Sequence, residues 1–320
     1  MSAGEPGLGL GFDAGGTATR WALARADGRI LAEGTVDGLH GRQVTSEERL
    51  HTESVLDQLA RAARRHAAPA YVAAGITGFE PTGPGGNVFE STLARSLSLQ
   101  PQDMALCNDV QMGYLSAFEP GEGYLVYAGT GSMAVFIDGH GVLHRAGGRG
   151  VLLDDGGGGF WIAKEALRRI WRREETVPQS WRESPMAVRL FGVVGAPEWR
   201  ATRQFLYASS RGDIGKLALH VAASADEDPL ARDVLRDAGE ELARLANVHL
   251  LRHGLRPVVL AGGASKLHPL ILNSMRTGLC IDAPLQMRTL QSHHKAAHLA
   301  AQGPLRLAEL RRVSEARAPP

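Results

Sequence analysis

Apolar runs and turns follow one another in the same order twice along the chain. Near the N-terminus, three short apolar runs are separated by turns rich in Gly, Thr and Asp, a pattern typical of strands joined by hairpins. The pattern starts again at Tyr124, roughly 115 residues further on. The strands predicted at the two starts cover residues 8–13, 20–25 and 30–36, and residues 124–127, 132–138 and 142–145.

Helical periodicity follows each of these starts. Residues 46–66 place apolar side chains at helical spacing, and most of the second half of the chain is predicted to be helical. Short apolar runs between the helices predict buried strands. The remaining predicted helices cover 87–99, 108–118, 158–173, 185–192, 198–208, 211–225, 228–253, a segment from about His268, and 295–313, and the remaining strands cover 70–76, 104–107 and 257–260.

Two α/β halves that begin alike indicate a duplicated domain, and ligands favour the cleft between such copies. A chain of 320 residues is long enough for two domains. We expect an N-terminal domain over residues 1–118 and a C-terminal domain with helical insertions over 119–320. The C-terminal helix is free to pack back on the N-terminal domain.

The charge balance and the cysteines narrow the class of protein. The chain has 35 Lys+Arg against 34 Asp+Glu and no basic stripe, so we expect no nucleic-acid partner. The first residues lack a signal-peptide pattern, and no apolar run approaches the ~20 residues that span a bilayer. Cys107 and Cys280 match no metal or redox spacing. We therefore expect a soluble cytoplasmic protein without a membrane partner, and a homodimer is left open.

Two glycine-rich turns are candidates for phosphate binding. Asp13 ends a predicted strand and precedes Gly15, Gly16, Thr17 and Thr19. Glycines let backbone N–H groups face an anion, and the carboxylate can hold Mg²⁺ through water. An ordinary hairpin turn would explain either motif alone, but a pair at equivalent points of two halves is more specific. The second turn contains Gly129, Thr130, Gly131 and Ser132, and no P-loop lysine follows either turn.

Asn108 and Asp109 stand where a predicted strand meets a helix. A carboxylate at such a junction can orient a hydroxyl and accept its proton during phosphoryl transfer. Asn and Asp are also preferred helix N-caps, worth about 1 kcal/mol each. Position alone leaves both interpretations open.

Two further glycine-rich segments carry few side chains and suit a bound ligand. Residues 147–150 precede Asp154 and Asp155, whose carboxylates can accept hydrogen bonds from the hydroxyls of a polyhydroxylated ligand. A flexible connection capped by Asp before a helix is the simpler explanation. Gly262 and Gly263 follow the predicted strand at 257–260, where the backbone could pass close to a nucleoside.

The order D-x-G-G-T-x-T, N-D, A-G-T-G-S, G-G-x-G-x-x-x-x-D and L-A-G-G-A resembles the N-acetylglucosamine kinase family. This family belongs to a wider group shared with ATPase subunits of benzoyl-CoA reductase. The resemblance implies an α/β fold of two ribonuclease-H-like (actin/hexokinase-like) domains flanking a nucleotide and sugar cleft. It implies an ATP- and Mg²⁺-dependent kinase acting on the 6-hydroxyl of N-acetylglucosamine or a related amino sugar, glucosamine or N-acetylmuramic acid.

The resemblance also assigns a role to each motif. Asp109 would be the general base and Asp13 the metal-site residue, and Asp155 would accept a sugar hydroxyl. Asn108, Gly148 and Arg149 would also contact the sugar. The residues assigned to ATP are Gly15, Gly16, Thr17, Thr19, Gly129, Thr130, Gly131, Ser132, Gly262 and Gly263.

This chain departs from the family pattern around the sugar. Arg149 replaces a Trp that relatives usually carry, and Gly156–Gly159 replace a common Glu-Gly-Ser. Residues 38–42, where relatives place an Asn against the sugar, contain no Asn. The phosphate motifs are intact. These departures therefore affect the identity of the sugar substrate and not the expected phosphoryl transfer.

The sequence leaves room for two other functions and one metal site. An ATPase activator that drives electron transfer in a partner would share an iron–sulfur cluster through cysteines near the second phosphate turn, and Cys107 and Cys280 fit this poorly. A sugar-sensing repressor would carry a helix-turn-helix and a Cys-rich zinc site, whereas a strand is predicted from Leu8. His294 and His298 are spaced as metal ligands on a helix, but a solvated helix end is the simpler explanation.

Overall fold

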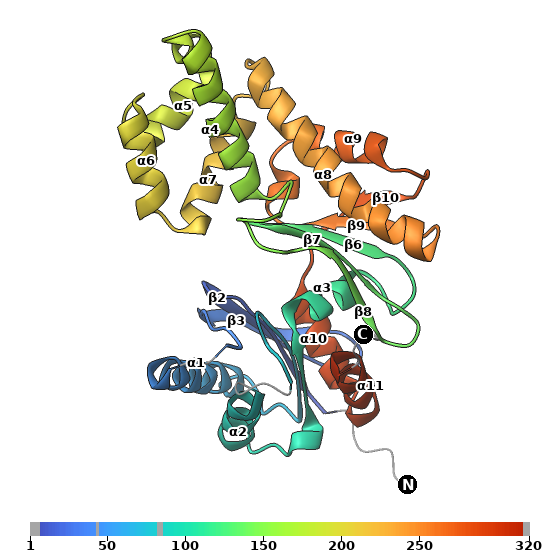
Figure 1. Cartoon of the computed structure of the whole chain (residues 1–320). Helices are drawn as coiled ribbons and strands as arrows, with labels where there is room; N and C mark the ends of the chain where they lie inside the picture. The colour runs from blue at the N-terminus through green and yellow to red at the C-terminus, as the bar shows by residue number, and fades with distance from the viewer. Residues whose placement is uncertain (1–6, 43–44, 82–85, 316–320) are drawn as a thin grey trace. The chain divides into compact units, whose positions relative to one another are not determined.

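The computed structural model describes residues 7–42, 45–81 and 86–315 of the chain (Figure 1). It divides into two compact units. The first consists of Met1–Gly121, Ile137–His144 and Leu290–Pro320, and the second consists of Glu122–Phe136 and Arg145–Thr289. The first unit is therefore assembled from three separate stretches of sequence, including the C-terminal one.

The first unit contains a five-stranded sheet in the order β3-β2-β1-β4-β5. Its first three strands form two antiparallel hairpins, as the sequence predicts, and β4 and β5 continue the sheet parallel to β1. The strands are β1 (Gly9–Ala14), β2 (Ala18–Ala24), β3 (Ile30–Asp37), β4 (Tyr71–Ile76) and β5 (Met104–Asn108).

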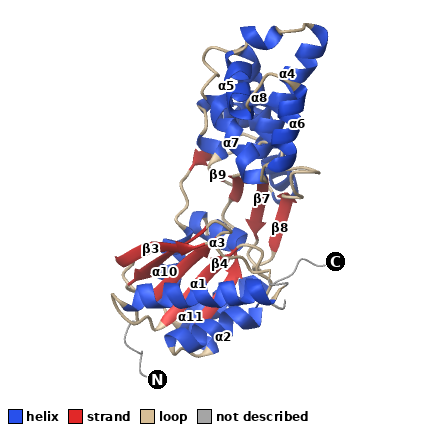
Figure 2. Cartoon of the chain, turned by 90° about the vertical axis from the view of Figure 1, so that its left-hand side faces the viewer, coloured by secondary structure: helices blue, strands red, loops and turns tan. Residues whose placement is uncertain are grey.

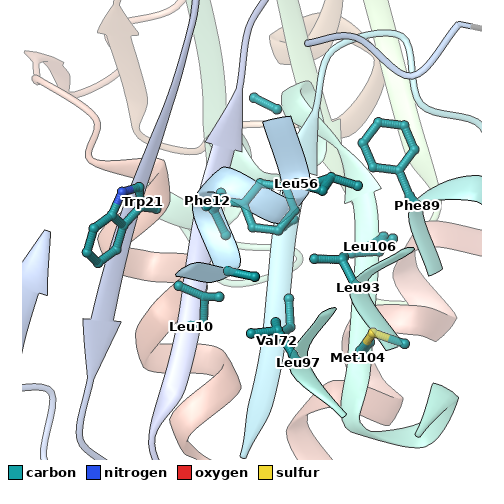
Figure 3. Close-up of a cluster of buried hydrophobic side chains, with 14 of the residues drawn as sticks. Leu10, Phe12, Trp21, Leu56, Val72, Phe89, Leu93, Leu97, Met104 and Leu106 are labelled. Carbon is teal, nitrogen blue, oxygen red and sulfur yellow. The ribbon is translucent and has the colours of Figure 1, made fainter. Parts of the chain in front are cut away.

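One face of this sheet carries the larger apolar core (Figure 3). Alternate residues of β1, Leu10 and Phe12, are fully buried against α1 (Ser46–Arg64) and α2 (Gly86–Leu97). Burying such side chains contributes about 1.5–3 kcal/mol each. This face therefore supplies much of the unit's stability.

The opposite face is covered by α3 (Asp109–Ala117), α10 (Ser292–Ala301) and α11 (Pro304–Glu315), the last two from the C-terminal stretch. Figures 1 and 2 show α10 and α11 beside the strands of the N-terminal half. The backbone of α10 lies directly on β1, because a Cβ at Gly11 would fall 1.9 Å from the Ala297 nitrogen. A Cβ at Gly9 would fall 2.2 Å from the Ala301 nitrogen. Only glycine at both positions permits this contact.

The second unit repeats the strand order of the first. Its sheet runs β8-β7-β6-β9-β10, which corresponds strand for strand to β3-β2-β1-β4-β5. The duplication predicted from the two similar starts is therefore confirmed. The strands are β6 (Tyr124–Ala128), β7 (Ser132–Ile137), β8 (Leu143–Gly147), β9 (Val258–Ala261) and β10 (Leu285–Met287), and the helices are α4 (Gly159–Thr176), α5 (Pro185–Val194), α6 (Trp199–Ala208), α7 (Arg211–Ala222), α8 (Pro229–His253) and α9 (Pro269–Gly278).

Two details differ from the sequence prediction. The single C-terminal helix expected over 295–313 is two helices, because Gly303 adopts a φ of +87° and Pro304 cannot continue a helix. The strand β10 was not predicted, since its three residues are mostly exposed and form no apolar run. In the part of the chain that the structure describes, no helix is long and apolar enough to cross a membrane.

The contact between α10 and β1 predicts that a methyl group added at Gly11 is destabilising, in contrast to one added at a glycine with free space around it. Gly11→Ala should destabilise the protein by about 1–3 kcal/mol, because the added methyl overlaps the α10 backbone. Gly192→Ala, in α5 with nothing within 4 Å of the new methyl, should stabilise by about 0.5–1 kcal/mol. Thermal unfolding followed by circular dichroism measures both. Equal midpoints for the two variants would contradict the close packing.

Candidate active site

Polar residues meet at the carboxyl ends of three neighbouring parallel strands in the first unit. Asp13 lies near the end of β1, Thr77 follows β4, and Asp109 follows β5. The register pairs Ala14 with Ile76 and Ile76 with Asn108, so the three strands end side by side. Ligands of open α/β sheets bind at this edge.

Asp109 accepts hydrogen bonds through both carboxylate oxygens, and the N-cap of its helix is the preceding residue, Asn108. The Thr77 hydroxyl donates to Asp109 Oδ2 at 2.7 Å. The N-cap of α3 is Asn108, whose Oδ1 accepts from the Val110 N–H at 3.1 Å and whose backbone N–H bonds to Gln111. Asn108 is thus the N-cap of α3, while Asp109 Oδ1 shares the same Val110 N–H at 3.0 Å and its Oδ2 is held by Thr77.

Asp13 is half-buried and lies close to a second carboxylate. Burial and the nearby Asp109 charge raise the pKa of Asp13 to about 6, and Arg20 partly offsets this rise. A fold retains such a pair at a cost, because each carboxylate disfavours ionisation of the other. Oxygen donors of this kind suit Mg²⁺, which binds through one or two carboxylates plus waters.

The first glycine turn is tied to the loop at residues 38–42. The Leu39 N–H donates to the Gly15 carbonyl at 3.0 Å, and the Gly41 N–H donates to the Thr77 carbonyl at 2.8 Å. The loop that lacks the family Asn is therefore attached both to the glycine turn and to the residue that holds Asp109. Gly16 and Thr17 are exposed, whereas Thr19 is fully buried and its hydroxyl has no partner in the described residues.

In the second unit, the second glycine turn interlocks with the segment that carries Asp155. The Gly159 N–H donates to the Gly129 carbonyl at 2.8 Å, and the Phe160 N–H donates to the Thr130 carbonyl at 3.0 Å. The Ser132 hydroxyl is buried and donates to the Gly156 carbonyl at 2.6 Å. That hydroxyl is thus engaged within the protein, while Thr130 is exposed and open to a ligand.

Asp155 packs against the backbone of Gly131. A Cβ at Gly131 would lie 2.2 Å from Asp155 Oδ2, so this approach requires glycine. Asp155 has a φ of +63°, a strained conformation for a residue with a side chain and one that recurs at functional sites. Burial raises the pKa of Asp155, and the Gly150 N–H, which donates to Oδ1 at 3.2 Å, opposes that rise.

The third glycine turn lies beside the second. Gly262 has a φ of +105°, and a Cβ there would fall 2.3 Å from the Ala128 carbonyl oxygen. Gly263 is exposed. The strands β6 and β9 are parallel neighbours, so these two turns share one edge of the second sheet. Gly148 and Arg149 are exposed on the loop that leads to Asp155.

A salt-bridge network that sequence reasoning missed anchors the Asp155 segment. Arg244, on α8, pairs with Asp154 at 2.9 Å and with Glu241 at 2.8 Å. A Cβ at Gly156 would lie 2.6 Å from Glu241 Oε2. A carboxylate from α8 therefore fills the space beside the position where relatives often carry Glu. No local signal marks these residues, because Asp154 and Arg244 are 90 positions apart.

Two sheets of matching strand order, with glycine turns at their carboxyl edges, define the actin/hexokinase-like class of α/β proteins. Residues 10–308 match the BadF/BadG/BcrA/BcrD ATPase family, and the chain belongs to that family.

Individual relatives include sugar kinases. The chain is 26% identical over 161 residues to the N-acetylmuramic acid/N-acetylglucosamine kinase of Clostridium acetobutylicum, a match that spans 50% of this chain and 52% of the relative. A solved structure described as a proposed N-acetylglucosamine kinase from Chromobacterium violaceum superposes with a TM-score of 0.71 at 26% identity, covering 92% of this chain and 99% of that one. A ROK family glucokinase from Streptomyces griseus, solved with glucose and AMPPNP, shares the fold at a TM-score of 0.56 and 18% identity, covering 93% and 100%.

The raised pKa predicts that Asp13 destabilises the ligand-free protein at neutral pH. An unfolded Asp titrates at 3.8 and the folded one at about 6, so the unfolded state binds fewer protons in this window and stability falls as the pH rises through it. At about pH 7.5, Asp13→Asn should raise the free energy of unfolding by up to about 3 kcal/mol, and the melting temperature with it. At about pH 4 it should change either quantity little. Asp27→Asn, in a turn, is the control. A variant no more stable than wild type at pH 7.5 would show that the carboxylate is not strained.

The Arg244 network predicts local rather than global loosening. Arg244→Met keeps the apolar stem but removes both salt bridges, so amide hydrogen exchange should speed up across residues 150–158. The melting temperature should change little, since partly exposed pairs contribute about 0–1 kcal/mol. Arg236→Met, which removes a pair with Asp233 on the same helix, should leave that segment unchanged. Identical exchange in both variants would remove Arg244 from any role in holding Asp155.

Proposed function

We propose that this protein is an ATP-dependent sugar kinase that phosphorylates the 6-hydroxyl of N-acetylglucosamine or a related amino sugar, glucosamine or N-acetylmuramic acid. The observation that carries the proposal is the Asp109 carboxylate, positioned by Thr77 next to Asp13 at the carboxyl ends of parallel strands. Family membership and sugar-kinase relatives support the same class of reaction.

In this proposal, Asp109 accepts the proton of the attacking sugar hydroxyl, a contribution of about 10²–10⁴-fold to rate. Asp13 would hold Mg²⁺ through water, and the bound ion would supply positive charge beside the transferring phosphoryl group. Asn108, Gly148, Arg149 and Asp155 contact the sugar. The ATP phosphates and adenosine are bound by Gly15, Gly16, Thr17, Thr19, Gly129, Thr130, Gly131, Ser132, Gly262 and Gly263. The side chains of Thr19 and Ser132 are buried, so their hydroxyls are less accessible to the nucleotide than that of Thr130.

Arg149 favours an acidic or strongly polar sugar. A guanidinium presents several donors and a fixed charge where an indole presents an apolar face and one donor. Arg149 is exposed on its loop and belongs to no salt bridge among the described residues, which leaves its charge available. N-acetylmuramic acid carries a carboxylate, so we place it beside N-acetylglucosamine as a substrate.

An activator of electron transfer is the alternative, and the cysteines do not favour it. Cys107 is buried in β5, where its thiol donates to the Ala74 carbonyl, and burial raises its pKa. Cys280 is exposed between α9 and β10. A shared cluster needs accessible thiolates together. ATP and reduced thiols both fit a cytoplasmic enzyme.

The test is phosphate transfer from radiolabelled ATP to glucosamine, N-acetylglucosamine, N-acetylmuramic acid and glucose. We expect sugar phosphate from at least one amino sugar, dependent on Mg²⁺. ATP hydrolysis without transfer to any sugar, together with an iron–sulfur absorption band in anaerobic protein, would favour the activator instead.

Asp109→Asn separates catalysis from folding within the same assay. The amide keeps the shape but not the basicity, so kcat should fall by about 10²–10⁴-fold. ATP affinity should stay nearly unchanged, and the melting temperature should not fall, because the cap of α3 is Asn108 and loss of the Asp109 charge relieves the neighbouring Asp13. Asp103→Asn, at the other end of β5, is the control. Retention of more than about a tenth of kcat would exclude Asp109 as the base.

A further inference from the structure

Two imidazoles and one carboxylate converge outside the candidate active site. His293 and His294 lie in the first turn of α10, and Glu33 lies on the edge strand β3. Glu33 Oε2 lies 2.5 Å from His294 Nε2 and 3.8 Å from His293 Nε2. One ligand atom from each residue falls within 4.8 Å of the other two. This group, called the Glu33 cluster below, lies wholly within the first unit.

The sheet register places Glu33 where it can reach the helix. Gly11 on β1 pairs with Ala22 on β2, and Ala22 pairs with Glu33 on β3, so the three residues form one row on one face. Gly11 and Ala22 are small, and the backbone of α10 descends onto them. The third residue of the row then extends its carboxylate to the first turn of α10.

An ion pair between Glu33 and His294 explains the position of His294 but not that of His293. His294 alone would satisfy the nearby Glu33 oxygen, while the 3.8 Å separation from His293 is too long for a hydrogen bond. Yet the His293 ring is turned toward the same oxygen and lies edge-on to His294, with ring centroids 4.3 Å apart. His293 is largely buried, with 13% of its side chain exposed. Burial, and after it the neighbouring His294 and Arg20, lowers the pKa of His293 to about 4, so this ring is in the neutral form that ligates metals.

We propose that Glu33, His293 and His294 form a binding site for a divalent transition-metal cation, with Zn²⁺ as its occupant. Zn²⁺ takes imidazole nitrogen at about 2.0–2.1 Å and carboxylate oxygen at about 2.0–2.2 Å, and it accepts three protein ligands plus water. Ligand atoms at these lengths around a tetrahedral ion lie about 3.3 Å apart. Rotation of the side chains must therefore lengthen the 2.5 Å Glu33–His294 separation and shorten the 3.8 Å Glu33–His293 separation. Mg²⁺ prefers oxygen ligands and does not compete for two imidazoles.

The bound cation would clamp the C-terminal stretch to the sheet edge. Glu33 lies on a strand of the N-terminal hairpin, while His293 and His294 come more than 250 residues later. The positive N-terminus of α10 and the Arg20 charge oppose a cation, so affinity should be below that of four-ligand structural sites. His298, one turn further along, belongs to a different contact, since its Nε2 lies 2.9 Å from the Gln302 amide nitrogen.

The experiment is calorimetric titration of the full chain with ZnCl₂, after chelator treatment, tag removal and saturation with Mg²⁺. We expect one Zn²⁺ per chain, and Co²⁺ at the same site should give visible bands typical of imidazole ligation. Glu33→Gln, His293→Gln and His294→Gln should each weaken Zn²⁺ binding by at least about tenfold, as loss of even outer-sphere partners costs ~10–100-fold. Zn²⁺ should also slow hydrogen exchange in the first turn of α10.

Two controls carry the same chemistry outside the Glu33 cluster. His144→Gln removes a histidine that pairs with Asp138 at 2.9 Å, and His298→Gln removes a histidine from α10 itself. Both should bind Zn²⁺ like wild type. Absence of saturable Zn²⁺ binding would overturn the proposal, as would binding that survives both Glu33→Gln and His294→Gln. These two side chains are partly exposed, so their variants decide the question even if His293→Gln fails to fold.

Discussion

The first unit is organised around a carboxylate that the fold would be more stable without. Asp13 is desolvated and lies close enough to Asp109 for its pKa to rise to about 6, a cost on the order of 3 kcal/mol in the ionised state. Parallel pairing of β1, β4 and β5 imposes this proximity, since the three strands end at one edge. Thr77 and Asn108 then fix the surroundings: Thr77 holds Asp109, and Asn108 caps the N-terminus of α3. A fold that keeps such repulsion gains affinity for cations at the same place.

The second unit differs from the first in that its glycine turns expose backbone groups, rather than a pair of carboxylates, at the edge of the sheet. Gly131 and Gly262 admit neighbours at distances that no side chain would tolerate, and Asp155 adopts a left-handed conformation beside them. Hydrogen bonds between residues 129–132 and 156–160 make the glycine turn and the Asp155 segment one structural piece. A change in either segment is therefore expected to be felt in the other.

Much of this was accessible from the sequence, because the informative signals are local. Alternating apolar runs and glycine turns predicted the duplicated strands, and the Asn108–Asp109 pair marked a strand-to-helix junction correctly. Which of the two residues caps the helix required coordinates, since both types cap well. Thr77 and Arg244 were missed because their partners are distant in sequence, 32 positions away in one case and 90 in the other. The break at Gly303 was visible in the sequence as Gly-Pro, but helical periodicity on both sides concealed it.

The discontinuous composition of the first unit has a consequence for biosynthesis. A ribosome releases the N-terminal strands long before Leu290–Pro320, yet the face of β1 that carries Gly9 and Gly11 is covered by α10 from that last stretch. Domains ordinarily fold in the order in which they emerge. Here one face of the nascent N-terminal sheet lacks its covering helix, α10, until the second unit has been synthesised. The contact between α10 and β1 therefore forms last. A translation product that ends before α10 would expose the face of β1 that carries Gly9 and Gly11.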